Sequence, residues 1–160
     1  MKVVYHEDYN QVYTSDPAAS EGRIEAVVAA LQGKVTWIQP EPAPIEDILR
    51  IHTQEHVKSV ESKGIYDIAA LAAGGAIMAA QIGLTEPCFA VIRPPGHHAS
   101  ADSSWGFCYF NNMAIAIDKL VRQGQIKKAF ILDFDLHFGD GNVDILGDRA
   151  DVTILNPSRQ

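Results

Sequence analysis

The sequence predicts an α/β protein in which helices cover both faces of a parallel β-sheet. Short apolar runs of strand length alternate with stretches that carry apolar residues at helical spacing, and this alternation is typical of a parallel sheet. Polar side chains follow directly after two of the apolar runs, at Arg93–His98 and Asp133–His137. Because ligands bind beyond the carboxyl ends of the strands in such sheets, both segments fall where a site is expected.

The expected strands are short runs bounded by polar residues, prolines or glycines. They are Lys2–Tyr5, Val35–Ile38, Cys88–Ile92, Ala129–Leu132 and Val152–Leu155. The third and fourth are apolar at every position, which is typical of strands buried on both faces of a sheet. The proline cluster after the second strand indicates a stiff connector rather than a boundary between domains.

Apolar residues at helical spacing predict the helices. The expected helices run from Pro17 to Leu31 and over Ile45–Ile51, His56–Ser62, Ile68–Ile82 and Asn111–Gln123. Asp16 is placed as an N-cap, with Pro17 at the first helical position. The segment Ile68–Leu84 comes nearest to a membrane span, but it is short, rich in alanine and glycine and interrupted by Gln81, so we expect a buried helix.

The composition is that of one globular domain, with 160 residues of which 47% are hydrophobic. The net charge of -7 argues against direct nucleic-acid binding and mildly favours a cationic small molecule or a lysine-bearing peptide. Cys88 and Cys108 are too few for a disulfide framework, and acidic residues stand where a signal peptide would be apolar. We therefore expect a cytoplasmic protein that binds no membrane.

His97 and His98 follow a stiff Pro-Pro-Gly turn, which can hold two imidazoles side by side. One imidazole can take a proton from water and pass it to a leaving amine, while the second supports charge in the transition state. For an isolated His-His pair, the polarity of a surface loop would be the commoner explanation. The metal-competent residues further along the chain favour the catalytic interpretation.

Asp133, Asp135 and His137 are spaced two residues apart directly after an apolar run. In extended chain, such spacing sends all three side chains from the same face. Aspartate oxygen and histidine nitrogen are both ligands of zinc, so the run indicates part of a metal site for assisted hydrolysis. The plainer alternative is an acidic residue that ends a strand and caps the next helix.

These two segments, with the run Gly106–Asn112 between them, resemble the zinc-dependent histone deacetylase and acetylpolyamine amidohydrolase superfamily. The three motifs occur in the family's order, and the resemblance covers nearly the whole chain. It implies a three-layer fold of the arginase/deacetylase type. Since the family's catalytic domain is about twice as long, we expect residues 1–160 to be the N-terminal part of a single catalytic domain, with only the first half of the fold present.

The resemblance also implies the roles of the polar residues. Asp135 and His137 match zinc ligands, and the family's third ligand is an aspartate expected beyond this chain. His98 matches the general base and acid, and His97 matches its electrostatic partner. The family places a carboxylate behind each imidazole, and the matching residues are Asp133 for His97 and Asp140 for His98.

The same resemblance implies a substrate channel and a second metal site. Phe107 matches one wall of a narrow tube that grips the aliphatic stem of the substrate, and the Gly106 carbonyl matches the acceptor of the amide N–H. The backbone carbonyls of Asp133, Asp135 and His137, with the Asp135 side chain, match most of a structural potassium site.

Two residues depart from the family pattern. Phe138 replaces a second histidine that is common there but is not a zinc ligand, and Trp105 stands where smaller residues are common, at the rim of the pocket. The arginase-type relatives carry Asp-x-His-x-Asp instead. Here Asp140 is three residues after His137 and the His-His pair is present, which argues against the arginase alternative.

We therefore expect zinc-dependent hydrolysis of the acetyl amide of an N-acetylated amine, with acetyl-lysine and acetylpolyamine both open as substrates. The alternative is a catalytically incomplete half-domain that acts as a subunit or interaction module. In the family's sheet, strands of the second half lie between the strands ending at Ile92 and Leu132. We expect the remainder of the domain or another chain to fill that place, and residues 1–160 alone to be unstable and without zinc-dependent turnover.

Overall fold

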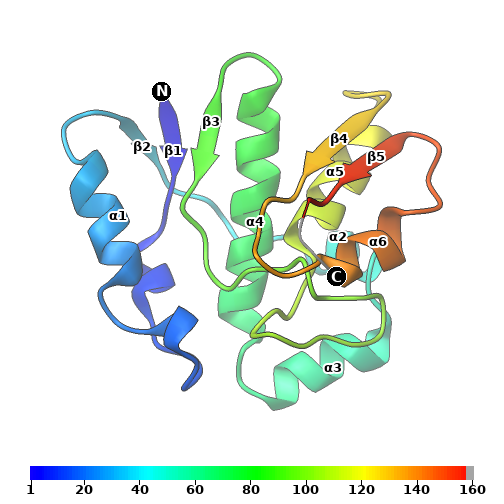
Figure 1. Ribbon diagram of the computed structural model, residues 1–160, viewed down its shortest axis with the longest axis horizontal. Coiled ribbons are helices and arrows are strands. Elements are labelled where there is room, and N and C mark those ends of the chain that lie inside the picture. The colour runs from blue at the N-terminus through cyan, green and yellow to red at the C-terminus, as the bar shows by residue number, and fades with distance from the viewer. Residues whose placement is uncertain (158–160) are drawn as a thin grey trace.

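The computed structural model describes residues 1–157, and its strands form two separate parallel sheets (Figure 1). In the first sheet β1 (Lys2–Val4) lies between β2 (Thr36–Ile38) and β3 (Cys88–Ala90), so that Val3 pairs with both Trp37 and Phe89. In the second sheet β4 (Ala129–Leu132) pairs with β5 (Val152–Leu155). All pairings are parallel, as the alternation of strands and helices predicts.

The edges of β3 and β4 that face each other are not paired with any strand of the described residues. A cavity of about 1400 Å³ lies between them, lined by Cys88 and Ala90 on one side and by Phe130 and Leu132 on the other. This is the position at which we expect strands beyond the first half of the fold. The described chain therefore builds two parts of a sheet with an open interval between them.

Helices and short 3-10 turns connect the strands. The helices are α1 (Arg23–Leu31), α2 (Ile45–Leu49), α3 (Gln54–Ser62), α4 (Tyr66–Gly83), α5 (Asn112–Arg122) and α6 (Asp140–Leu146), and the 3-10 turns are η1 (Glu7–Asn10) and η2 (Pro17–Ala19). The expected helices are present with ends shifted by a few residues, except at α1. The helix α6 was not predicted, and its first residue is the site residue Asp140.

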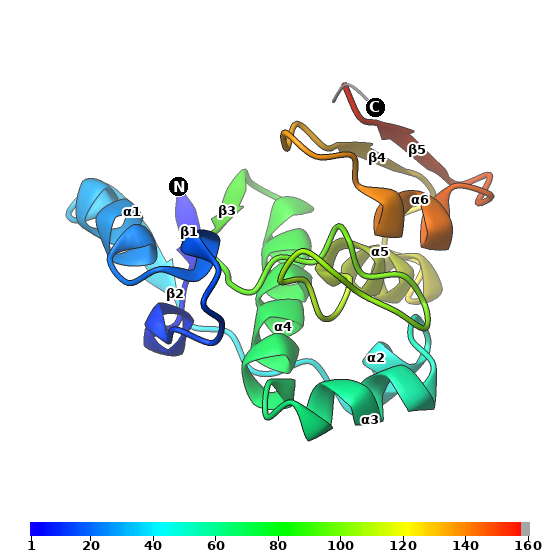
Figure 2. The same ribbon diagram turned by 60° about the horizontal axis from the view of Figure 1, so that its bottom comes forward.

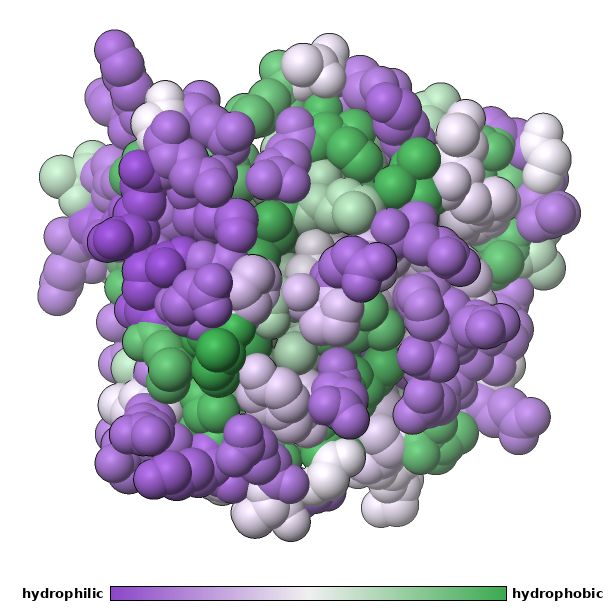
Figure 3. Space-filling view, turned by 180° about the vertical axis from the view of Figure 1, so that it is seen from behind, coloured by the Kyte–Doolittle hydropathy of each residue, from purple (hydrophilic) through white to green (hydrophobic). Residues whose placement is uncertain are grey.

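The core is built around α4, which packs against α5, β1 and β3. Gly74 lets α4 approach the proline connector, because a Cβ there would lie 1.9 Å from the backbone oxygen of Glu41. Among the described residues α4 is the one helix long and apolar enough to cross a membrane, and half of it is buried inside the protein. Seen from behind, apolar side chains form a band down the middle of the molecule between more polar margins (Figure 3).

The first helix does not begin at Pro17, so that prediction is wrong. Asp16 and Pro17 lead into the short turn η2, and α1 begins only at Arg23. The reason is Gly22, which adopts a left-handed conformation with φ 86° and interrupts the helix before it can form. No side chain of α1 is fully buried.

The strands β3 and β4 are not buried on both faces, which corrects the expectation drawn from their apolar sequences. Ile131 is buried, but Phe89, Phe130 and Leu132 are exposed. Figure 2 shows α5 and α6 on one side of β4 and β5, with no described helix on the other. The apolar sequences of β3 and β4 therefore include side chains on a sheet face that no described residue covers.

Candidate active site

The site residues lie where β3 and β4 end. His97 and His98 stand on the loop after β3, the run Asp133–His137 follows β4, and Asp140 opens α6. These segments line the same cavity that separates the two sheets, together with Trp105, Gly106 and Phe107. The carboxyl ends of parallel strands thus bring together residues that are about 40 positions apart in sequence.

His97 contacts the carboxylate of Asp133, which further hydrogen bonds hold in place. His97 Nδ1 lies 3.1 Å from Oδ2 of Asp133. The same oxygen accepts a hydrogen bond from Nδ2 of Asn142 at 3.0 Å, and Oδ1 accepts one from the backbone N–H of Asp135 at 3.2 Å. The Asp133 side chain is only 7% exposed. Its hydrogen bonds therefore fix it within the interior.

His98 contacts Asp140, as the resemblance implies, at a shorter distance. Nδ1 of the buried His98 lies 2.6 Å from Oδ1 of Asp140, and Trp105 Nε1 donates to Oδ2 at 2.7 Å. Burial raises the pKa of Asp140, but hydrogen bonds from His98, Trp105 and the backbone of Gly141 outweigh it, so this pKa lies below its usual value. An ionised carboxylate can only accept, and Nδ1 of His98 is therefore the donor.

The imidazole of His98 is enclosed by neighbouring rings. The centroid of His97 lies 4.0 Å away and that of Trp105 lies 3.7 Å away, the latter in a stacked arrangement. A Cβ at Gly106 would come within 2.7 Å of Cδ2 of His98, and Gly106 has φ 56°. Only glycine fits this position without moving the ring.

Asp135 and His137 lie close to each other but not in extended chain, contrary to the prediction. The backbone N–H of Asp135 donates to the carboxylate of Asp133, and that of His137 donates to Asp135 Oδ1 at 2.8 Å. These hydrogen bonds between residues two positions apart bend the chain, which is typical of aspartates just after a strand. The side chains of Asp135 and His137 are 51% and 65% exposed.

The bend still brings metal-competent atoms together. Oδ1 of Asp135 lies 3.3 Å from Nδ1 of His137 and 3.9 Å from Nε2 of His97. Two ligands of a tetrahedral zinc ion lie about 3.3–3.5 Å apart, given the usual bond lengths, so Asp135 and His137 fit such a pair. Burial raises the pKa of Asp135, but the hydrogen bond from the His137 N–H and the charge of His97 outweigh it and lower this pKa. The carboxylate is thus in the form that binds metal.

Within residues 1–157, no group of three or more histidine, cysteine or acidic side chains is arranged to hold a metal ion. The third zinc ligand expected beyond this chain therefore stays a prediction. The potassium site expected at the backbone carbonyls of Asp133, Asp135 and His137 also stays a prediction.

Phe107 lies at the wall of the cavity, next to Gly106. Its φ of 53° is the only positive value at a non-glycine residue in the described chain. Such a conformation is unfavourable for a bulky residue and persists only where its surroundings impose it. The loop therefore holds the backbone of Phe107 in an unusual conformation at the wall of the cavity that His98 also lines.

Sequence reasoning missed three residues that hold the site together. Asn111 caps α5, and its side chain accepts the N–H of Ala114. It also donates to Asn142 Oδ1 at 3.0 Å, and Asn142 in turn donates to Asp133. His52, which is buried, accepts the N–H of Asn111 at Nε2 and contacts the Ser100 carbonyl through Nδ1. The asparagine and histidine side chains gave no periodic signal that would have revealed these contacts.

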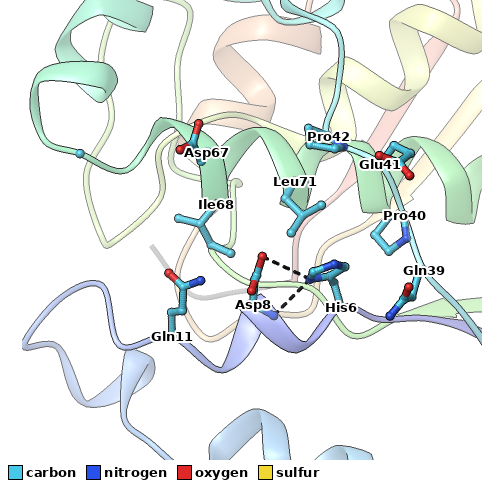
Figure 4. Close-up of a pocket in the computed structure, with 11 residues that line it drawn as sticks. His6, Asp8, Gln11, Gln39, Pro40, Glu41, Pro42, Asp67, Ile68 and Leu71 are labelled. Carbon is cyan, nitrogen blue, oxygen red and sulfur yellow. Dashed lines mark hydrogen bonds and ion pairs between the residues drawn. The ribbon is translucent and has the colours of Figure 1, made fainter.

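A second pocket of about 430 Å³ lies between η1, the proline connector and α4 (Figure 4). His6 contacts Asp8 at its edge, and Ile68 and Leu71 form an apolar side. None of the residues expected in the active site lines it.

Several known proteins are similar to this chain. The model of the histone deacetylase domain matches residues 17–157. A probable deacetylase of Archaeoglobus fulgidus is 39% identical over 89% of this chain and 47% of its own length. An acetylpolyamine amidohydrolase 2 of Pseudomonas aeruginosa is 53% identical over 40% of this chain and 18% of its own length.

The crystal structure of an HDA15 HD domain superposes with a TM-score of 0.85 at 26% identity, covering 97% of this chain and 52% of that one. This match confirms the arginase/deacetylase type of fold. The chain spans about half the length of the curated relatives that match most of it. With a family match over nearly all of its residues, the chain belongs to the histone deacetylase family.

Proposed function

We propose that this chain carries the proton-transfer residues of an enzyme that hydrolyses the acetyl amide of an N-acetylated amine. The observation that carries the proposal is the pair of His–Asp contacts at adjacent histidines, His97–Asp133 at 3.1 Å and His98–Asp140 at 2.6 Å. The pair stands next to Asp135, a metal-competent carboxylate. Membership of a deacetylase family supports hydrolysis of an acetyl amide.

His98 is the proposed general base and acid. Donation of its Nδ1–H to Asp140 leaves the lone pair of Nε2 to take a proton from the attacking water. His98 then returns that proton to the nitrogen of the leaving amine. His97, whose Nδ1 contacts Asp133, supports the negative charge that develops on the substrate oxygen.

Zinc is the proposed cofactor, and Asp135 and His137 are the residues of this chain that would hold it. Their 3.3 Å separation and the lowered pKa of Asp135 support this assignment. When bound, zinc supplies polarisation of the acetyl carbonyl and activation of water. Potassium at the backbone of Asp133, Asp135 and His137 is proposed as a structural ion only.

The proposed substrate has an unbranched arm that ends in the acetylated nitrogen. Phe107 lines the cavity beside His98 and supports an apolar wall for the methylene groups of that arm. Gly106 is the proposed acceptor of the amide N–H. Acetyl-lysine in a peptide and acetylpolyamine both have such an arm, and the net charge of -7 suits the positive charge of either.

A second candidate role is that of an incomplete half-domain acting as a subunit. The open edges of β3 and β4 favour it, because unpaired apolar strand edges invite association. We propose that the remainder of the domain or another chain fills this interval and that residues 1–160 alone do not turn over substrate. We further propose a cytoplasmic location, with no direct nucleic-acid or membrane partner.

A deacetylase assay of the longest natural form of the protein separates the two roles. The substrates are an acetyl-lysine peptide and an N-acetylated polyamine, and bound zinc is measured on the same sample. Turnover that depends on zinc supports the enzyme. No turnover on either substrate by a folded, zinc-loaded protein would favour the subunit role.

A further inference from the structure

We propose that Trp105 is a positioning residue, which holds Asp140 and the His98 ring in the arrangement that proton transfer requires; this inference rests on the proposed function. Trp105 is 55% exposed, so it is not a residue of the hydrophobic core. The hydrogen bond and the ring stack that its side chain makes both go to the His98–Asp140 pair. Its neighbours in the loop, Gly106 and Phe107, line the same cavity.

The indole N–H fixes the rotation of the Asp140 carboxylate. Trp105 Nε1 donates to Oδ2 while His98 Nδ1 contacts Oδ1, so the two side chains take different oxygens of one carboxylate. The Asp140 side chain is 45% exposed and stands at the start of a helix, where water competes for its oxygens. The Trp105 hydrogen bond therefore opposes rotation of the carboxylate away from His98.

The indole ring holds the imidazole from a second direction. The ring centroids of Trp105 and His98 lie 3.7 Å apart with an interplanar angle of 30°. Stacking limits the tilt of the imidazole, and an aromatic face attracts the imidazolium that forms when His98 takes a proton. Trp105 thus acts on both members of the pair.

The carboxylate of the other His–Asp pair also has a second side-chain donor, although this donor shares one oxygen with the histidine. Asn142 Nδ2 donates to Oδ2 of Asp133, the oxygen that also contacts His97. Each carboxylate behind an imidazole therefore has a second side-chain donor. The buried carboxylate has an amide, and the half-exposed one has an indole, whose ring also covers the imidazole.

The loop that carries Trp105 is anchored independently of the indole. Ala99 and Ser104 form an antiparallel bridge, and the His52 ring joins the Ser100 carbonyl to the Asn111 N–H at the two ends of the loop. A substitution of Trp105 therefore leaves the anchors of the loop in place. Its effects report on the indole rather than on the loop as a whole.

The test compares Trp105→Phe and Trp105→Ala with a matched control, Trp37→Phe, in the longest natural form of the protein loaded with zinc. Trp37 is the only other tryptophan and lies in β2, in the first sheet. Steady-state kinetics on an acetyl-lysine peptide give kcat and KM. Nitrogen-15 NMR of the histidine rings gives the fraction of His98 that carries its proton on Nδ1.

Trp105→Phe keeps an aromatic ring but loses the N–H, and kcat should fall about 10-fold with KM almost unchanged. Trp105→Ala loses both contacts, and kcat should fall by about 10–100-fold. Both should lower the Nδ1–H fraction of His98, while Trp37→Phe should change neither quantity. Should Trp105→Ala fail to fold, Trp105→Phe decides.

Unchanged kcat and an unchanged His98 proton position in the Trp105 variants would overturn this inference. A rise in KM alone would also overturn it, because Trp105 would then be a wall of the substrate channel. The variant His98→Ala distinguishes failure of the Trp105 inference from failure of the proposed function. If His98→Ala retains normal turnover, the proposed function fails, and the NMR result still decides the role of Trp105.

Discussion

The histidine pair and the metal-competent run at the same site differ in how completely this chain holds them. His98 and Asp133 are buried, and each is hydrogen-bonded to a neighbouring side chain. Asp135 and His137 are about half exposed or more, and the apolar side chains between and beside them, Phe134 and Leu136, are 82% and 83% exposed. The proposed acid–base part is thus preorganised, whereas no described residue covers the proposed metal-binding part.

The exposed apolar residues Phe134 and Leu136 mark a surface that further protein could cover. Phe134 and Leu136 precede and follow Asp135 in the sequence, and both line the cavity between β3 and β4. Burying side chains of this size stabilises a protein by about 1.5–3 kcal/mol each. We therefore expect the side chains of the proposed metal-binding run to become buried when further protein covers them.

The largest effect is expected from removing a proposed metal ligand. Asp135→Ala or His137→Ala should abolish bound zinc and, with it, turnover, because an open zinc site needs three protein ligands. Zinc content by mass spectrometry of the purified protein is the measurement. Asp144→Ala, which changes an exposed carboxylate on α6, is the control and should retain zinc. One equivalent of metal in either ligand variant would refute the assignment.

The two carboxylates behind the imidazoles should respond differently to amide substitution. Asp140→Asn should lower kcat by about 10²-fold or more with little loss of stability, since it is half exposed but sets the position of the His98 proton. Asp133→Asn places an NH₂ group among donors in the interior and should also cost about 1–3 kcal/mol of unfolding free energy. Kinetics and chemical denaturation separate the two effects. Equal losses of stability would contradict the contrast in burial.

The buried His52 should make the stability of the protein depend on pH. Burial, with a smaller effect from the charge of His56, lowers the pKa of His52 to about 4. The unfolded chain takes up a proton at this residue below about pH 6.5, whereas the folded protein does not until about pH 4. The unfolding free energy should therefore fall by up to about 3 kcal/mol as pH drops from 6.5 to 4. His52→Gln, measured by denaturation across this range, should lose most of that pH dependence. If the unfolding free energy of the variant falls with pH as steeply as that of the parent, His52 is not the cause.

The smallest expected effect is on substrate binding at the cavity wall. Phe107→Asp removes apolar contact with the methylene groups of the substrate and should raise KM about 10-fold, since each buried CH₂ contributes about 0.8 kcal/mol. Phe107→Leu keeps an apolar wall and serves as the control. An unchanged KM for Phe107→Asp would remove this residue from the channel.

The sequence predicted the strands and the contacts His97–Asp133 and His98–Asp140, because apolar runs mark strands and the motifs carry the family's order. It did not predict the break at Gly22, where one left-handed glycine outweighs the Asp16–Pro17 helix start. It also missed α6, whose short run from Asp140 has weak helical spacing.

The bend at Asp135 and the contacts of Trp105, Asn142 and His52 could not be predicted either. The bend depends on local hydrogen bonds from backbone N–H groups to aspartate side chains, which compete with extended chain. The other contacts join residues apart in sequence through single polar groups, and the spacing of apolar residues does not reveal such pairs.

The most direct test of proton transfer by His98 is to measure zinc content and turnover of His98→Ala in the same preparation of the longest natural form. His98 lies outside the proposed metal ligands, so the variant should bind zinc as the parent does. Its kcat should fall by about 10²–10⁴-fold, the usual effect of losing a general base. A variant that retains zinc and near-normal turnover across the pH range would contradict the account.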